Sequence, residues 1–279
     1  MSLFVSSLNS GSNGNCYYIG NQEEAVLIDG GISCRETEKR MKRLNLSMKR
    51  VKGVFVSHEH SDHINGVKSL SKKYKFPIYI TKGTFQFGRL NLTEGPIVSF
   101  KAYEPIVIGN LTVTAFPKFH DANDPHSFLV SSNTVTVGVF TDIGRLCEHV
   151  IKHFKQCHAA FLESNYDEEM LENGKYPIYL KNRIRDGSGH LSNTEAAELF
   201  SNHKPPFMSH LFLSHLSKNN NTPKIVKDVF NKIAGSTEII IAPRDKETQL
   251  YHVRDLGNIF SNSTILRSQR PQLQLSLFQ

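Results

Sequence analysis

The chain has 279 residues, of which 39% are hydrophobic and 21% are charged. This balance is ordinary for a soluble globular protein and excludes an intrinsically disordered chain. No apolar run approaches the roughly 20 residues that a membrane-spanning helix requires. The formal net charge of +7 favours a polyanionic partner such as nucleic acid, although solvated basic helix faces would explain it equally well.

The first residues, Met-Ser-Leu-Phe-Val, contain neither a basic segment nor an extended apolar one, so we expect no secretory signal. The cysteines lack a C-x-x-C pair, which argues against a structural zinc ribbon or a disulfide framework. They are Cys16, Cys34, Cys147 and Cys157. Reduced thiols and a cytoplasmic location are therefore expected.

Strands dominate the first half of the chain. β-Branched and aromatic residues between turn signals predict strands, and apolar residues at helical spacing predict helices. In chain order these are strands at 16–19 and 25–28, a helix at 37–46, a strand at 51–57, a helix at 63–74, and strands at 78–81, 107–108, 111–116, 127–130 and 136–141.

The second half alternates helices and strands. The predicted order is a helix at 148–155, a strand at 159–163, helices at 167–173 and 194–201, a strand at 210–214, a helix at 223–234 and a strand at 238–241. A strand-rich half followed by an alternating half indicates two packed sheets with helices outside. We expect one domain over residues 1–260 and a loosely structured tail over 261–279.

The strongest chemical signal follows the predicted strand 51–57. Four potential ligands stand within six residues there, namely His58, His60, Asp62 and His63. Imidazole and carboxylate suit zinc, manganese or iron. His58 and His60 can face one ion, and Asp62 and His63 can reach a second one where the chain turns into a helix. A single histidine is usually structural, but this array predicts a metal site.

This H-x-H-x-D-H array resembles the signature of the metallo-β-lactamase superfamily. The resemblance implies an α/β fold, a four-layer αββα sandwich, with the site along the edge of the two sheets. It also implies further ligands after later strands: His120, Asp142 and His215. His58, His60 and His120 would then hold one ion, Asp62, His63 and His215 the other, with Asp142 between the two ions.

Each further ligand has an alternative. His126 competes with His120, which is preferred because it directly follows a strand. Asp142 could be a helix N-cap instead. His210 competes with His215, but His210 begins its strand and is expected to be structural. Asp29 matches the superfamily's aspartate after the second strand, and we expect it to orient a ligand rather than to bind metal.

The second half resembles the YycJ/VicX (WalJ) group of this superfamily. The matching motifs are Phe161-Leu162-Glu163-Ser164-Asn165, Gly189-His190-Leu191-Ser192-Asn193 and His215-Leu216-Ser217-Lys218-Asn219. The opening segment 8–15 fits the group as well. The group implies a cytoplasmic, metal-dependent 5′→3′ DNA exonuclease that acts in DNA repair. One departure is Tyr166, where the group commonly has histidine.

Glu163 and His190 also resemble a pair in tRNA 3′-processing nucleases of the superfamily. Carried over, His190 would protonate or stabilise the leaving alkoxide and Glu163 would orient it. A positioned acid can contribute roughly 10²–10⁴ in rate. The alternative is that His190 caps the following helix or binds phosphate.

The predicted mechanism uses two divalent ions, zinc or manganese, to activate water and neutralise charge on the phosphate. Asp62 would hold the attacking hydroxide and accept its proton. The glycine- and asparagine-rich loop 10–15 presents backbone N–H groups to a phosphate in this interpretation, or is only a tight turn.

The last residues contain Gln274-Leu275-Ser276-Leu277-Phe278. This segment resembles the peptide by which bacterial replication and repair proteins dock on the DNA sliding clamp. Leu277 and Phe278 would enter an apolar pocket while Gln274 forms a hydrogen bond at its rim. The alternative is an edge strand packed on the chain's own domain, because the segment alternates with period two.

Three competing functions are compatible with parts of this sequence. An RNA-processing nuclease would use the same groups, because the sequence does not show how a 2′-hydroxyl is treated. A small-molecule hydrolase acting on a thioester or lactam would share every ligand. A non-catalytic binding module is disfavoured by the complete ligand set. DNA is the preferred nucleic acid, and no membrane partner is expected.

Overall fold

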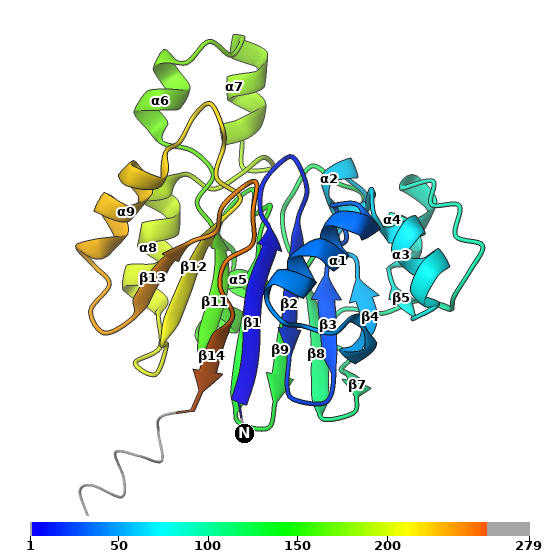
Figure 1. The fold of residues 1–279 in the computed structure, drawn as a ribbon. Helices are drawn as coiled ribbons and strands as arrows, with labels where there is room; N and C mark the ends of the chain where they lie inside the picture. Colours follow the sequence, from blue (N-terminus) through cyan, green and yellow to red (C-terminus); the bar gives the residue numbers. More distant parts are fainter. Residues whose placement is uncertain (1, 256–279) are drawn as a thin grey trace, which may run out of the picture.

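Two seven-stranded sheets form the body of the computed structural model, which describes residues 2–255 (Figure 1). The first sheet, in spatial order, contains β14 (Tyr251–Arg254), β1 (Ser2–Asn9), β2 (Cys16–Gly20), β3 (Ala25–Ile28), β4 (Val51–Phe55), β5 (Ile78–Tyr79) and β6 (Ile97–Val98). The second contains β13 (Glu238–Ile241), β12 (His210–Ser214), β11 (Ala159–Glu163), β10 (Val135–Phe140), β9 (His126–Ser132), β8 (Leu111–Pro117) and β7 (Ile106–Ile108).

Helices cover the outer faces of both sheets. The first half of the chain has α1 (Cys34–Arg43), the 3₁₀ turn η1 (Met48–Arg50), α2 (Ser61–Ile64), α3 (Val67–Tyr74) and α4 (Lys82–Phe87). The second half has α5 (Glu148–Phe154), α6 (Glu168–Asn173), α7 (Ile178–Arg185), α8 (Asn193–His203) and α9 (Pro223–Asn231). Buried side chains of α1 and α3 pack on the first sheet, and those of α5, α8 and α9 pack on the second.

The central core lies between the two sheets. Aromatic rings meet across it: Tyr17 of β2 and Phe161 of β11 have centroids 4.9 Å apart, and Phe55 of β4 and Phe128 of β9 have centroids 5.8 Å apart. Such aromatic pairs bury large apolar areas and hold the sheets at a fixed separation. The αββα four-layer prediction is confirmed.

The carboxyl ends of several strands meet at one edge of the sandwich. β3 and β4 are parallel, and β10, β11 and β12 are parallel to one another. β8 runs in the same direction as β10, because both are antiparallel to β9. Residues that directly follow these strands, although far apart in sequence, are therefore brought to a common edge, as in other open α/β sheets.

The predicted helix 63–74 is wrong at its start. Two helices, α2 and α3, replace it, and Gly66 lies between them. The N–H of Gly66 donates a hydrogen bond to the carbonyl oxygen of Gly30 at 2.7 Å, so the chain bends to meet the loop after β3. A Cβ at Gly66 would lie 1.8 Å from the carbonyl oxygen of Ile32, so only glycine fits here.

Other helices and strands also differ from the prediction in their bounds. Helix α1 begins three residues before the predicted 37–46, because the Ser33 hydroxyl accepts a hydrogen bond from the N–H of Glu36 and caps it. Five elements were not predicted: β1, α4, β6, α7 and β14. β1 contains serines that weaken its strand signal, and its pairing with β2 and β14 supplies the order.

The clamp-like peptide and the predicted tail 261–279 lie outside the described residues. Among residues 2–255, no helix combines the length and the apolar character that crossing a bilayer demands.

Gly31 gives a test of the packing beside the histidine array. Its N–H donates to the carbonyl oxygen of Asn15, and a Cβ there would lie 1.7 Å from the carbonyl oxygen of Asp62. Gly31→Ala should lower the free energy of unfolding by at least about 1–3 kcal/mol, measured by urea denaturation.

Gly187→Ala is the matched control for that experiment. A Cβ at Gly187 would approach only Cδ of Arg145, at 3.7 Å, so its cost is limited to its left-handed backbone, whose φ is +84°. Equal losses in the two variants would contradict the predicted clash at Gly31.

Candidate metal centre

Three of the predicted site residues adopt left-handed backbone conformations at strand ends. Asp29 directly follows β3, Asp142 closely follows β10 and His215 directly follows β12, with φ angles of 62°, 54° and 57°. This conformation costs a non-glycine residue about 1–2 kcal/mol. Strain of this kind clusters at functional sites, where it turns a side chain sharply out of the strand.

Three imidazoles converge beyond β4 and β8. Nε2 of His58 lies 3.1 Å from Nδ1 of His60, and Nε2 of His120 lies 3.3 Å from the same Nδ1. Zinc–nitrogen bonds of about 2.0–2.1 Å in a tetrahedral ion place ligand atoms about 3.4 Å apart. This three-histidine group (His58, His60 and His120) therefore has the spacing of one face of a coordination sphere.

Asp62, His63 and His215 form a second group, called the aspartate group below. Oδ2 of Asp62 lies 3.5 Å from Nε2 of His63 and 3.5 Å from Nε2 of His215. The short helix α2 brings Asp62 and His63 to the edge of the first sheet, whereas His215 comes from the second sheet. The aspartate group thus joins the two sheets.

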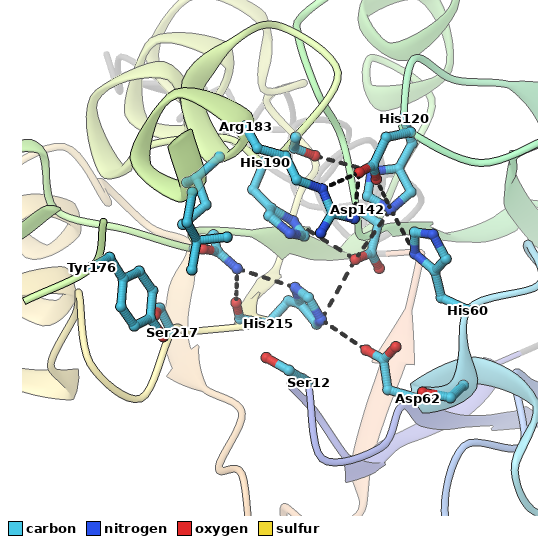
Figure 2. Close-up of a pocket in the computed structure, with 16 residues that line it drawn as sticks. Ser12, His60, Asp62, His120, Asp142, Tyr176, Arg183, His190, His215 and Ser217 are labelled. Carbon is cyan, nitrogen blue, oxygen red and sulfur yellow. Dashed lines mark hydrogen bonds and ion pairs between the residues drawn. The ribbon is translucent and has the colours of Figure 1, made fainter. Parts of the chain in front are cut away.

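Asp142 contacts both groups (Figure 2). Its Oδ2 lies 3.1 Å from Nε2 of His63, and its Oδ1 lies 3.5 Å from Nε2 of His215 and 3.9 Å from Nε2 of His120. The structure therefore brings all seven predicted ligands together, with Asp142 between the two groups.

Neighbouring side chains hold these ligands in orientation. Oδ2 of Asp29 lies 2.7 Å from Nδ1 of His63, which leaves Nε2 of His63 toward the aspartate group. The backbone N–H of Ser57 donates to Oδ1 of Asp29, and its hydroxyl lies 2.9 Å from Nδ1 of His58. Nδ1 of His120 lies 2.9 Å from the carbonyl oxygen of Gly189. Asp29 thus touches a member of a ligand group and belongs to neither group.

The two alternative histidines lie elsewhere. Nδ1 of His126 is 3.0 Å from the carbonyl oxygen of Asp124, and its ring packs edge-on against Phe100. His210 stands at the start of β12 with its ring against Phe212. Neither belongs to a convergent ligand group among the described residues.

Glu163, the last residue of β11, links the aspartate group to His190. Its Oε1 lies 2.8 Å from Nδ1 of His190 and 3.0 Å from Nδ1 of His215. Its Oε2 accepts hydrogen bonds from the backbone N–H groups of Ile143 and Leu191, at 2.7 and 3.3 Å. Burial raises the pKa of a carboxyl, but His190 and His215 outweigh that effect and lower the pKa of Glu163 to about 2. Glu163 is therefore an ionised, fully buried anchor.

A pocket of about 390 Å³ opens over both groups. His60, Asp62, His120, Asp142, His190 and His215 line it, together with Tyr176 and Arg183 (Figure 2). Its volume is at the small end of the range for small-molecule sites, which is about 300–1,000 Å³. The ligand groups are thus reachable from solvent.

A family model described as a beta-lactamase superfamily domain matches residues 24–215, a span that contains every predicted ligand. The chain belongs to the metallo-β-lactamase superfamily. This membership agrees with the four-layer fold and with the strand-end position of the site.

Sequence relatives narrow the place of the chain in the superfamily. Exodeoxyribonuclease YycJ of Bacillus anthracis is 34% identical over 230 residues, which cover 81% of this chain and 87% of the relative. Exodeoxyribonuclease WalJ of Streptococcus pneumoniae is 29% identical over 227 residues, which cover 79% of this chain and 84% of the relative. The resemblance to the YycJ/VicX group is confirmed.

A solved structure supports the fold. The metallo-beta-lactamase fold protein YhfI of Bacillus subtilis superposes with a TM-score of 0.70 at 16% identity, covering 90% of this chain and 99% of that protein. At this identity the likeness is one of fold alone.

The residues present fit a divalent metal centre of this superfamily. Oδ2 of Asp142 is buried, and Nε2 of His63, 3.1 Å away, is its ion-pair partner. A buried carboxylate is costly unless positive charge compensates it. A donor set of imidazoles and carboxylates at these spacings suits borderline divalent cations.

The two groups differ in their protonation. Burial lowers the pKa of His58 well below its ordinary value and lowers the pKa of His120 to about 3. Burial would lower the pKa of His215 as well, but Asp142, Asp62 and Glu163 outweigh it and raise that pKa to about 10. The same balance, with Asp142 as the main carboxylate, raises the pKa of His63 well above its ordinary value.

Two residues at the centre were missed by the sequence analysis. Nδ2 of Asn15 donates to Oδ2 of Asp62 at 3.1 Å, so the loop 10–15 positions a ligand by a side-chain contact. Lys118 is buried, and its Nζ donates to the carbonyl oxygen of Thr141 at 2.6 Å, directly before Asp142. The lysine steadies the left-handed turn that presents Asp142. Lysine is usually exposed, so no local pattern indicates this role.

Tyr166, the departure from the group's pattern, is also buried. Its carbonyl oxygen accepts a hydrogen bond from the N–H of Asn193, and its side chain lines a different pocket beside Leu171 and Arg185. It does not line the pocket over the metal centre. The departure lies behind the pocket wall.

Proton release on metal binding follows from these pKa shifts. Metal ligation needs neutral imidazoles, and His63 and His215 are protonated at neutral pH in the ion-free protein, whereas His58 and His120 are not. The aspartate group should therefore release about one to two protons per ion bound, and its affinity should rise with pH up to about 10.

Isothermal titration calorimetry in buffers of different ionisation enthalpy measures this release. The three-histidine group serves as the internal comparison, because its ion should bind with little proton release. An affinity for both ions that stays flat between about pH 6 and about pH 9 would contradict the assignment.

Proposed function

We propose that the chain is a two-metal-ion nuclease that removes nucleotides from the end of a DNA strand. The observation that carries this proposal is His190, held by Glu163 at the wall of a pocket whose floor is built by two convergent ligand groups. The YycJ and WalJ relatives of this chain are named exodeoxyribonucleases, which supports DNA as the substrate.

Seven residues would hold the two ions: His58, His60 and His120 one of them, Asp62, His63 and His215 the other, with Asp142 between. Zinc and manganese both suit these ligands. When bound, divalent ions held by these residues would supply activation of a water molecule at neutral pH and compensation of charge on the reacting phosphate. This is the chemistry that a phosphodiester, a poor electrophile, requires.

Asp62 would orient the attacking water and accept its proton. Its side chain is 18% exposed, whereas those of Asp142 and His63 are almost fully buried, so Asp62 meets the pocket most directly. Nδ2 of Asn15 donates a hydrogen bond to Oδ2 of Asp62, which lines the pocket. The carboxylate is thereby aimed toward the pocket.

His190 would donate a proton to the leaving alkoxide. Glu163 faces its Nδ1 at 2.8 Å, so Nδ1 carries a hydrogen and Nε2 is the atom available to the substrate. The side chain of His190 is 23% exposed, so it can reach a bound molecule. The Glu163 carboxylate accepts the hydrogen on Nδ1 and fixes the orientation of the ring.

Finer features of the proposal come from the resemblance. They are the 5′→3′ polarity, the role in DNA repair, the cytoplasmic location and docking on the sliding clamp through Gln274, Leu275, Leu277 and Phe278. The division into a domain over 1–260 and a tail over 261–279 is part of the same proposal. An RNA-processing nuclease or a thioester or lactam hydrolase would use the same ligand groups, so purified protein should be tested on end-labelled DNA and RNA of matched sequence.

Metal content tests the two-ion assignment. The unaltered chain should bind about two divalent ions, and His60→Ala should reduce this to about one, because it removes one ligand of the three-histidine group. Inductively coupled plasma mass spectrometry on dialysed protein gives the ratio.

His126→Ala is the control, because this buried histidine belongs to neither ligand group. It should retain both ions. A loss of metal that is the same in the two variants would indicate general destabilisation and remove the assignment.

The acid role of His190 predicts a dependence on the leaving group. His190→Ala should lower kcat on DNA by about 10²–10⁴-fold. On thymidine 5′-(p-nitrophenyl phosphate) the loss should be below about tenfold, because p-nitrophenolate leaves without protonation. His203→Ala, a histidine at the end of α8 outside the pocket lining, should change neither rate. Equal losses on both substrates would show that His190 is not the acid.

A further inference from the structure

Helix α7 stands beside the metal centre without taking part in the core. None of its side chains is buried, and its Ile178 and Tyr179 are 62% and 72% exposed. In Figure 1, α6 and α7 project beyond the body of the sandwich, at the end where the site strands finish. Core packing therefore does not explain why this helix carries exposed apolar side chains.

Three contacts fix α7 to the segments that carry the ligands. The Arg183 guanidinium donates to Oδ2 of Asp121 at 2.6 Å through Nε, and its Nη2 lies 2.5 Å from the same oxygen. Asp121 directly follows His120. The carbonyl oxygen of Ile184 accepts a hydrogen bond from the N–H of His190 at 2.8 Å. The helix thus has a defined position relative to the metal centre.

The third contact lies just before the helix. Nδ2 of Asn219, in the loop after His215, donates to the Tyr176 hydroxyl at 2.9 Å. Figure 2 shows Tyr176 across the pocket from His60. The segment from Tyr176 to Ile184 therefore spans the pocket from the His215 side to the His120 side.

The pocket-facing side chains of this segment have a mixed chemistry. Tyr176, Leu180 and Ile184 contribute apolar surface to the pocket, and Arg183 contributes a cation. Residues 178–185 contain three cationic side chains and no acidic one. Tyr179 lies one turn before Arg183 on the same side of the helix, next to Leu180, and its ring is exposed to solvent. Arg183 is paired with Asp121 and Arg185 with Glu172, so it is the apolar and aromatic surface of this wall that complements the base and sugar of a nucleotide.

We propose that α7 binds the terminal nucleotide of the substrate strand, with its sugar against Leu180 and Ile184 and its base on the ring of Tyr179. This inference rests on the proposed nuclease function and adds the surface that selects nucleotides. The pocket volume of about 390 Å³ accommodates one nucleotide rather than a duplex. In this arrangement the diester lies at the two ligand groups, and α7 holds the nucleoside attached to it.

Two chromogenic diesters with the same leaving group test the proposal. Thymidine 5′-(p-nitrophenyl phosphate) carries one nucleoside, whereas methyl p-nitrophenyl phosphate carries none. The double variant Tyr179→Ala/Leu180→Ala keeps good helix formers in α7. With the metal-loaded full chain, it should lower kcat/KM on the thymidine diester about tenfold, mainly through KM. On the methyl diester it should change kcat/KM less than about twofold.

Phe207→Ala is the matched control. Phe207 is an exposed aromatic residue that contacts His158, at the end of β11 opposite to the metal centre. It should leave both rates unchanged. An equal change on the two diesters, or no change on either, overturns the role of α7 and leaves the nuclease proposal standing. Failure of the unaltered protein to hydrolyse DNA and both diesters overturns the nuclease proposal and this inference with it.

Discussion

The buried carboxylate of Asp142 is the contact on which the functional site depends. It comes from the second sheet, yet its oxygens lie beside His63 from the first sheet and beside His120 and His215 from the second. Asp62 and Glu163 lie close by, so negative charge accumulates in a buried region. Such an arrangement is costly unless positive charge compensates it. Protons on His63 and His215 do so in the ion-free protein, and divalent cations take their place when bound.

The layered fold supplies the rigidity that this arrangement needs. Aromatic pairs across the central core, such as Phe55 with Phe128, hold the two sheets in one relative position. The parallel strands then deliver their carboxyl ends to one edge. Left-handed turns at Asp29, Asp142 and His215 direct the side chains away from the strands and into the site. The strain of these turns is offset by the packing of the surrounding core.

The proposed function assigns chemistry and substrate selection to different parts of the chain. The strand ends and the buried anchors Asp29, Glu163 and Lys118 position the groups that react. The segment 176–184 adds the side chains of Tyr176, Leu180, Arg183 and Ile184 to the lining of the same pocket. Helix α7 has no buried side chain, so it contributes little to the core.

The sequence by itself determined the local features. The six-residue histidine array was recognisable because its ligands are adjacent in the chain, and most strands showed β-branched runs. His120, Asp142 and His215 were predicted as ligands only from the family resemblance. Nothing in the local sequence shows that the ends of separate strands lie close together. Tertiary structure alone decided that Asn15 and Lys118 reach the site, that β1 lies between β2 and β14, and that α7 stands over the pocket. These features depend on contacts between residues far apart in sequence. The local pattern of apolar and polar residues carries no information about the energies of such contacts.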